Sequence, residues 1–165
     1  MKEIRDPRAK TYRKNFVSKA LVPNIVYEQL KDLQGKNLTT VLDFGCGVDL
    51  YWPNKFREAD IPCDGYDLSL SNTTRKDLLS SYCVIMVSNV LNVQAAHNQL
   101  AQTLRKILSF AARQSLIIWN YPPSPRKLDL TNEEMIEELR DMIWQEGADC
   151  QTREIAKNVY ETIIL

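Results

Sequence analysis

The most restrictive feature of this sequence is a buried strand that runs directly into two glycines. Residues 39–47 read Thr-Thr-Val-Leu-Asp-Phe-Gly-Cys-Gly, so a β-branched and aliphatic run stops at Gly45-Cys46-Gly47. The chain has only five glycines in 165 residues, which makes two of them two positions apart informative. Because glycine tolerates a positive φ and lets the backbone pass close to a neighbour, the pattern predicts a strand that ends in a tight turn.

A chain of 165 residues is the size of one domain. At this length, folding buries about 70% of the unfolded surface, so the core needs neither a metal nor a disulfide. Lys and Arg total 21, as do Asp and Glu, so the overall charge gives no argument for binding nucleic acid or a membrane. The longest aliphatic runs, 83–87 and 116–119, are far shorter than the roughly 20 residues of a membrane helix.

The N-terminal segment, residues 1–19, differs in composition from the domain expected over residues 20–165. It carries seven Lys or Arg and two acidic residues, a local charge of +5. It lacks the apolar stretch of a secretory signal, so we expect a cytoplasmic protein. Two interpretations stay open. The segment is a solvated tail, or it grips a phosphate backbone or closes over a ligand, with Tyr12 and Phe16 among its basic side chains.

Apolar runs with two different periods alternate along residues 20–165. Helical spacing predicts helices over 23–34, 52–59, 95–113 and 131–146, and apolar runs predict strands over 39–44, 61–67, 82–87, 115–119, 150–155 and 159–165. Residues 68–82 are polar, so a strand there is short or absent. Thr131 and Glu134 have the spacing of a capping box. The helix that they begin has an acidic outer face, which we interpret as solvent-exposed.

This alternation predicts an α/β fold, a Rossmann-like three-layer sandwich with a mainly parallel sheet. The last two strands are separated only by residues 156–158, and a hairpin this short is antiparallel. The sheet should therefore contain one antiparallel strand at the C-terminus. Ligands bind such sheets outside the carboxyl ends of the strands.

Two features predict a nucleoside site at that edge. The glycine turn leaves backbone amides accessible. Asp67 ends the second strand, 20 residues beyond Gly47, where a carboxylate can accept both hydroxyls of a ribose. A dinucleotide would need a third glycine, but Leu50 stands there, and Asp49 would repel a pyrophosphate. A monocharged or zwitterionic nucleoside fits better, and the alternative is that the glycine turn is purely architectural.

Three segments resemble the class I S-adenosylmethionine-dependent methyltransferases: VLDFGCG (41–47), GYD (65–67) and CVIMVSNVLNV (83–93). The last segment is most similar to small phage and bacterial methyltransferases, some associated with DNA modification. The resemblance covers residues 20–165. It implies a seven-stranded sheet whose last strand is antiparallel, and S-adenosylmethionine as cofactor with S-adenosylhomocysteine as product and no metal.

The resemblance also implies which residues bind the cofactor. Its amino-acid and ribose parts would contact residues of the glycine turn, and the next strand end would hold its ribose hydroxyls and adenine. The end of the fourth strand of the family fold would bring cofactor and substrate together. In that order, the implied residues are Asp43, Gly45, Cys46 and Gly47, then Asp67 and Leu68, then Ser88 and Asn89.

A sulfonium methyl group is already activated, so the enzyme needs mainly an in-line approach and exclusion of water. Asn89 is the candidate catalytic residue, because it could accept a hydrogen bond from an amine or hydroxyl nucleophile; its other interpretation is a cap for the following helix. Methyltransferases of exocyclic amines carry Asp/Asn/Ser-Pro-Pro-aromatic at this place. Here the segment Asn120-Tyr121-Pro122-Pro123 follows the next strand instead, and we interpret it as a connection rather than a substrate contact.

The cysteines and the single histidine do not indicate a further catalytic or metal site. Four scattered cysteines without a C-x-x-C pair favour buried thiols over redox or zinc roles. The single histidine, His97, argues against a zinc site or a Ser/His/Asp triad, and its polar neighbours favour a surface position.

Three functions remain open. The first is a methyltransferase acting on a nitrogen or oxygen acceptor, with DNA favoured by the subfamily resemblance and the basic N-terminus, and a small molecule also compatible. The second is a non-catalytic cofactor-binding or partner-activating subunit. The third is another nucleotide-using enzyme of Rossmann-like fold.

Overall fold

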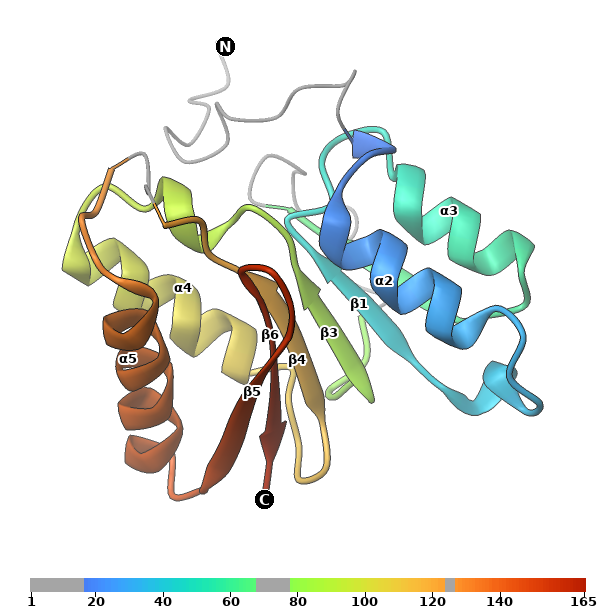
Figure 1. Cartoon of the computed structure of the whole chain (residues 1–165). Helices are drawn as coiled ribbons and strands as arrows, with labels where there is room; N and C mark the ends of the chain where they lie inside the picture. The colour runs from blue at the N-terminus through green and yellow to red at the C-terminus, as the bar shows by residue number, and fades with distance from the viewer. Residues whose placement is uncertain (1–16, 68–77, 124–126) are drawn as a thin grey trace, which may run out of the picture.

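The computed structural model describes residues 17–67, 78–123 and 127–165, and Figure 1 shows their arrangement. Strands alternate with helices along the chain as predicted. The strands are β1 (Val41–Phe44), β2 (Cys63–Tyr66), β3 (Val84–Val87), β4 (Leu116–Asn120), β5 (Cys150–Ala156) and β6 (Val159–Ile164). The helices are α2 (Leu21–Leu30), η2 (Lys36–Leu38), α3 (Tyr51–Glu58), η3 (Leu91–Val93), α4 (His97–Leu108) and α5 (Asn132–Gln145).

One sheet joins all six strands, in the order β2-β1-β3-β4-β6-β5. The first four strands are parallel, and β6 lies antiparallel between β4 and β5. The predicted class, a mainly parallel α/β sheet with a C-terminal antiparallel hairpin, is confirmed. The family resemblance implied seven strands, and the described residues form six. Residues 68–77, where a further strand was expected to be short or absent, lie outside the described part of the chain.

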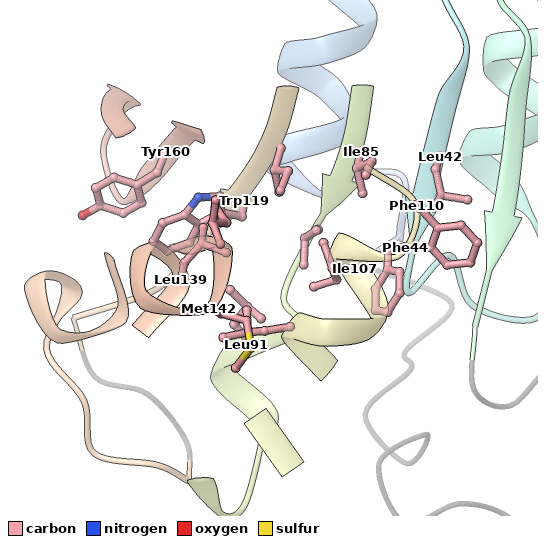
Figure 2. Close-up of a cluster of buried hydrophobic side chains, with 14 of the residues drawn as sticks. Leu42, Phe44, Ile85, Leu91, Ile107, Phe110, Trp119, Leu139, Met142 and Tyr160 are labelled. Atoms are coloured by element: carbon pink, nitrogen blue, oxygen red, sulfur yellow. The ribbon is translucent and has the colours of Figure 1, made fainter. Parts of the chain in front are cut away.

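Helices cover both faces of this sheet, α2 and α3 on one side and α4 and α5 on the other (Figure 1). Successive side chains of a strand point to opposite faces of the sheet. In β1, Val41 therefore packs in the core beneath α2 and α3, whereas Leu42 and Phe44 pack in the core beneath α4 and α5. Figure 2 shows the second core, in which Trp119 and Leu139 are packed between the sheet and its helices. These two cores fix the strand ends that carry the candidate site.

Some element ends differ from the prediction. The helix expected over residues 95–113 runs only from His97 to Leu108, because Ala96 is an extended N-cap and residues 109–115 form a tight connection to β4. The helix expected over 23–34 ends at Leu30, and Gly35 then takes φ 73° at the start of η2. The predicted capping box of α5 is confirmed, with Thr131 and Glu134 bonded reciprocally.

The surface features follow the sequence except at two of the four cysteines. His97 is exposed, and so are Glu133, Glu137 and Asp141 on the outer face of α5. The thiols of Cys46 and Cys63 are buried as expected, whereas Cys150 is only half-buried and Cys83 is exposed. Cys83 precedes the amino end of β3 and lies beside the Thr40 hydroxyl. Among the described residues, no helix is both long and apolar enough to cross a bilayer.

Candidate functional site

The glycine turn follows β1 directly and is held by backbone hydrogen bonds to the end of β2. Gly45 and Gly47 adopt φ 86° and 73°, the left-handed region in which a side chain is strained. The amides of Gly45 and Cys46 both donate to the carbonyl oxygen of Tyr66, at 2.6 and 3.2 Å. Since β1 and β2 are neighbouring parallel strands, their carboxyl ends are thereby joined into one backbone ledge.

Gly45 also allows the segment after β3 to lie against the turn. A Cβ at position 45 would stand 2.5 Å from Cγ2 of Val90, far inside van der Waals contact. Gly65 in β2 has a similar role, because a Cβ there would meet the Cys46 sulfur and Leu50 Cδ2, each at 2.7 Å. The glycines therefore set how closely three strand ends approach one another.

Asp67 closes the turn from the second strand. Its Oδ2 accepts a hydrogen bond from the Gly47 amide at 2.8 Å, across the 20-residue separation in sequence. The structure thus brings together the two features that the sequence analysis paired, the Gly-x-Gly turn and the acidic strand end. Leu68, the residue expected beside the adenine, lies outside the described residues.

Asp43 is the most perturbed carboxyl group of this edge. It lies in the middle of β1 with only 3% of its surface exposed. Burial, and then the negative charge of Asp67, raise the pKa of Asp43 to about 7. Burial likewise raises the pKa of the Cys46 thiol far above its usual range. Cys46 is therefore protonated and unsuited to act as a nucleophile.

The segment after β3 carries polar atoms that have no hydrogen-bond partner within the described chain. They are the Ser88 hydroxyl oxygen and Oδ1 of Asn92, both buried. Asn92 as a whole is 7% exposed. A buried polar atom that stays unpaired is costly, so native structures usually satisfy it with water or a ligand. Ser88 and Asn92 therefore mark a place where a bound molecule would be stabilising.

Asn89 and Asn120 join the carboxyl ends of β3 and β4. The Asn89 backbone amide donates to Oδ1 of Asn120 at 2.7 Å, and Nδ2 of Asn120 donates to Oδ1 of Asn89 at 2.8 Å. Asn89 has φ 55° and caps neither η3 nor α4, whose N-caps are Val90 and Ala96. The helix-cap interpretation of Asn89 is therefore wrong.

The loop after β4 is anchored mainly as a connection. Tyr121 is fully buried, its hydroxyl donates to the Leu128 carbonyl at 3.1 Å, and its amide donates to the Asn158 carbonyl at 3.1 Å. Asn120, however, reaches the edge predicted to bind ligands, which sequence reasoning missed. The only signal available was the position of Asn120 at the end of a strand next to β3.

The rest of the described chain offers no competing chemical centre. His97 lies on the surface, 3.9 Å from a carboxylate oxygen of Glu138. No group of three or more His, Cys, Asp or Glu side chains in the described ranges could hold a metal ion. The candidate site is thus the carboxyl edge, from the glycine turn to Asn120.

No protein-family model matches this chain, and no curated protein does. Solved structures do match its fold. A magnesium protoporphyrin IX methyltransferase from Synechocystis, with bound S-adenosylmethionine, is 17% identical, with a TM-score of 0.55 over 95% of this chain and 88% of that one. A TehB-like methyltransferase from Corynebacterium glutamicum is 9% identical, with a TM-score of 0.60 over 91% of both chains.

A third similar structure is an amino pentose methyltransferase from Micromonospora echinaspora, 10% identical, with a TM-score of 0.53 over 95% of this chain and 93% of that one. All three similarities extend over most of both chains. The chain therefore has the fold of the class I S-adenosylmethionine-dependent methyltransferases, as its sequence motifs indicated.

Proposed function

We propose that the protein is an S-adenosylmethionine-dependent methyltransferase that acts on a nitrogen or oxygen acceptor in the cytoplasm. The observation that carries the proposal is the Gly45–Gly47 turn bonded to Asp67, at the carboxyl edge of a sheet with this fold. Similar structures with this fold include methyltransferases for a porphyrin and for an amino pentose.

The residues at the edge fit this cofactor in charge and in shape. S-adenosylmethionine carries an ammonium and a sulfonium, both positive. Burial, and then the negative charge of Asp67, disfavour ionisation of Asp43, and a cation beside the two carboxylates offsets that repulsion. Gly45 is exposed, so the backbone of the turn is accessible to a ligand. Ser88 supplies an unpaired buried hydroxyl in the described structure.

Each residue has a role in this proposal. Asp67 accepts hydrogen bonds from the ribose hydroxyls, because a carboxylate is an acceptor only, and its bond to the Gly47 amide holds it at the turn. Asp43 balances the ammonium charge of the amino-acid part. The turn residues Gly45, Cys46 and Gly47 contact the amino-acid and ribose parts, and Leu68 lies beside the adenine.

When bound, the cofactor supplies a methyl group that needs no further activation. The protein has to align the acceptor and exclude water, which contributes through orientation rather than acid or base chemistry. In this proposal Ser88 and Asn89 hold the acceptor against the cofactor. DNA and a small molecule both remain candidate acceptors, and the basic residues 1–19 are the proposed contact for a nucleic acid.

Methyl transfer is tested with S-adenosylmethionine labelled with tritium in the methyl group. The protein is incubated with double-stranded DNA of mixed sequence and, separately, with a small-molecule extract of bacterial cells. Label transferred to either fraction by the wild type, and lost in Asp67→Ala, is the expected result. No transfer by a protein that still binds the cofactor would instead support a non-catalytic binding subunit.

A further inference from the structure

The segment from Ser88 to Asn92 faces the same edge as the glycine turn. Cγ2 of Val90 lies 2.5 Å from the position that a Cβ of Gly45 would take, so this segment is packed directly against the turn. Ser88 and Asn92 bring buried oxygens without partners in the described chain. Asn89 lies between them and is exposed. The acceptor site of the proposed reaction is therefore bordered by residues 88–92.

The hydrogen bonds of Asn120 fix the orientation of two carboxamides. A backbone amide can only donate, so the Asn120 atom facing the amide of Asn89 must be oxygen. The other terminal atom of Asn120 is then nitrogen and donates, so the Asn89 atom facing it must be oxygen. Of the four terminal atoms of the two carboxamides, this leaves Nδ2 of Asn89, which can donate two hydrogen bonds. It has no partner in the described part of the chain.

We propose that Asn120 is the positioning residue of the acceptor site. Its two hydrogen bonds turn the Nδ2 donor of Asn89 toward the acceptor, and this donor selects a carboxylate oxygen over an amine. This inference rests on the proposed methyltransferase function and narrows its acceptor.

The chemistry of a donor at this position favours a carboxylate. One carboxylate oxygen accepts the Nδ2 proton of Asn89, and the other attacks the methyl carbon. A C–O bond forms as the C–S bond breaks, its electron pair stays on sulfur, and the products are a methyl ester and S-adenosylhomocysteine. No proton moves, so no general base is needed. A donor aimed at an amine would instead engage the lone pair that must attack the methyl group.

The inference is tested with two planar probes, benzoate and aniline, added to the ¹⁵N-labelled protein saturated with S-adenosylhomocysteine. The side-chain NH₂ signal of Asn89 is assigned by its loss in Asn89→Ala. We expect benzoate to shift this signal and aniline to leave it in place. A shift with aniline as large as with benzoate, or no shift with either probe, would overturn the inference.

Asn120→Asp should reverse the preference. A carboxylate at position 120 only accepts, so Asn89 would turn its own Nδ2 inward and its oxygen outward. Benzoate affinity should fall roughly tenfold and aniline should begin to bind, because a charged hydrogen bond is exchanged for a repulsion. The matched control is Asn98→Asp at an exposed position of α4, which adds the same charge elsewhere and should change the binding of neither probe. Equal effects of the two variants would contradict a positioning role.

A second variant tests the same pair if Asn120→Asp does not fold. Asn120→Ser removes both carboxamide bonds and should weaken benzoate binding without creating aniline binding. Calorimetry with S-adenosylhomocysteine tests the proposed function separately from the acceptor inference. If the wild type fails to bind it, the proposed function fails, whereas normal binding together with an unchanged probe preference in Asn120→Asp contradicts only the acceptor inference.

Discussion

The two halves of the carboxyl edge are held together by different kinds of bond. Between β1 and β2, all three donors are backbone amides: those of Gly45 and Cys46 donate to the Tyr66 carbonyl, and that of Gly47 donates to the Asp67 carboxylate. Beyond the ends of β3 and β4, both bonds depend on the Asn120 carboxamide, which accepts from the Asn89 backbone amide and donates to the Asn89 side chain. The first half is proposed to bind the cofactor and the second the acceptor.

This difference suits a cofactor site that is shared by a fold class and an acceptor site that is particular to one protein. Backbone bonds and glycine conformations do not depend on the ligand's acceptor chemistry, so they suit a half that binds the same cofactor throughout a fold class. Carboxamide pairs can be changed by one substitution. The acceptor half is therefore the place where a new substrate preference would arise at little cost to the fold.

The largest expected effect concerns Asp43 and pH. Its pKa is raised to about 7 in the folded protein, against about 3.9 in an unfolded chain. A raised pKa favours folding at low pH, and this contribution is lost as the pH rises from about 4 to 7. The loss is on the order of 4 kcal/mol. Urea unfolding across this range should show a falling free energy of unfolding that Asp43→Asn flattens; parallel curves would contradict the assignment.

Gly45→Ala tests whether the two halves depend on close contact. It should lower the free energy of unfolding by about 3 kcal/mol, from the strained φ and from the clash with Val90. Gly35→Ala is the matched control, since Gly35 has a similar φ of 73° but nothing within 4 Å, and should cost only about 1 kcal/mol. Equal losses would mean that the contact with Val90 is unimportant. Adding Val90→Ala should recover part of the loss.

Asp67→Ala tests the cofactor half alone. We expect about 100-fold weaker binding of S-adenosylmethionine, because the charged acceptor of the ribose hydroxyls and of the Gly47 amide is removed. Calorimetric titration measures this, and Asp141→Ala on the exposed face of α5 should bind like the wild type. Unchanged affinity in Asp67→Ala would leave the turn as architecture only.

The smallest effect is expected at the start of α5, beside the acceptor half, where Asn132 bonds to Asn158. Thr131→Ala removes the capping box and should lower the free energy of unfolding by about 1 kcal/mol. Thermal unfolding measures this loss. Cofactor affinity should stay at the wild-type value, and a change in it would show that the two halves are coupled.

Much of the fold was predictable because burial and backbone conformation leave local signals. Continuous apolar runs identified β3 and β4, Thr131 and Glu134 marked the start of α5, and the short turn at 156–158 required an antiparallel hairpin. The end of α4 was less predictable, since Ala111 keeps the helical spacing although the helix ends at Leu108. Beyond it, Phe110 and Gln114 form backbone hydrogen bonds to Tyr82 and Ile164, so tertiary contacts and not local preference decide where the helix ends.

The site was predictable in one half only. The glycine turn and Asp67 could be paired because strand ends of a parallel sheet share an edge. The Asn89–Asn120 bonds join residues 31 positions apart on different strands. Single-residue patterns contain no signal for such a pair. The same absence of a long-range signal explains why Asn89 was open to interpretation as a helix cap.

The most direct test of the account is calorimetric titration of the folded wild-type protein with S-adenosylmethionine and S-adenosylhomocysteine, with NAD as the control. We expect micromolar binding of the sulfur ligands and no binding of NAD, which Asp49 and the absent third glycine disfavour. Preferential binding of NAD, or no binding of either sulfur ligand, would contradict the claim that the Gly45–Gly47 turn and Asp67 form a methyl-donor site.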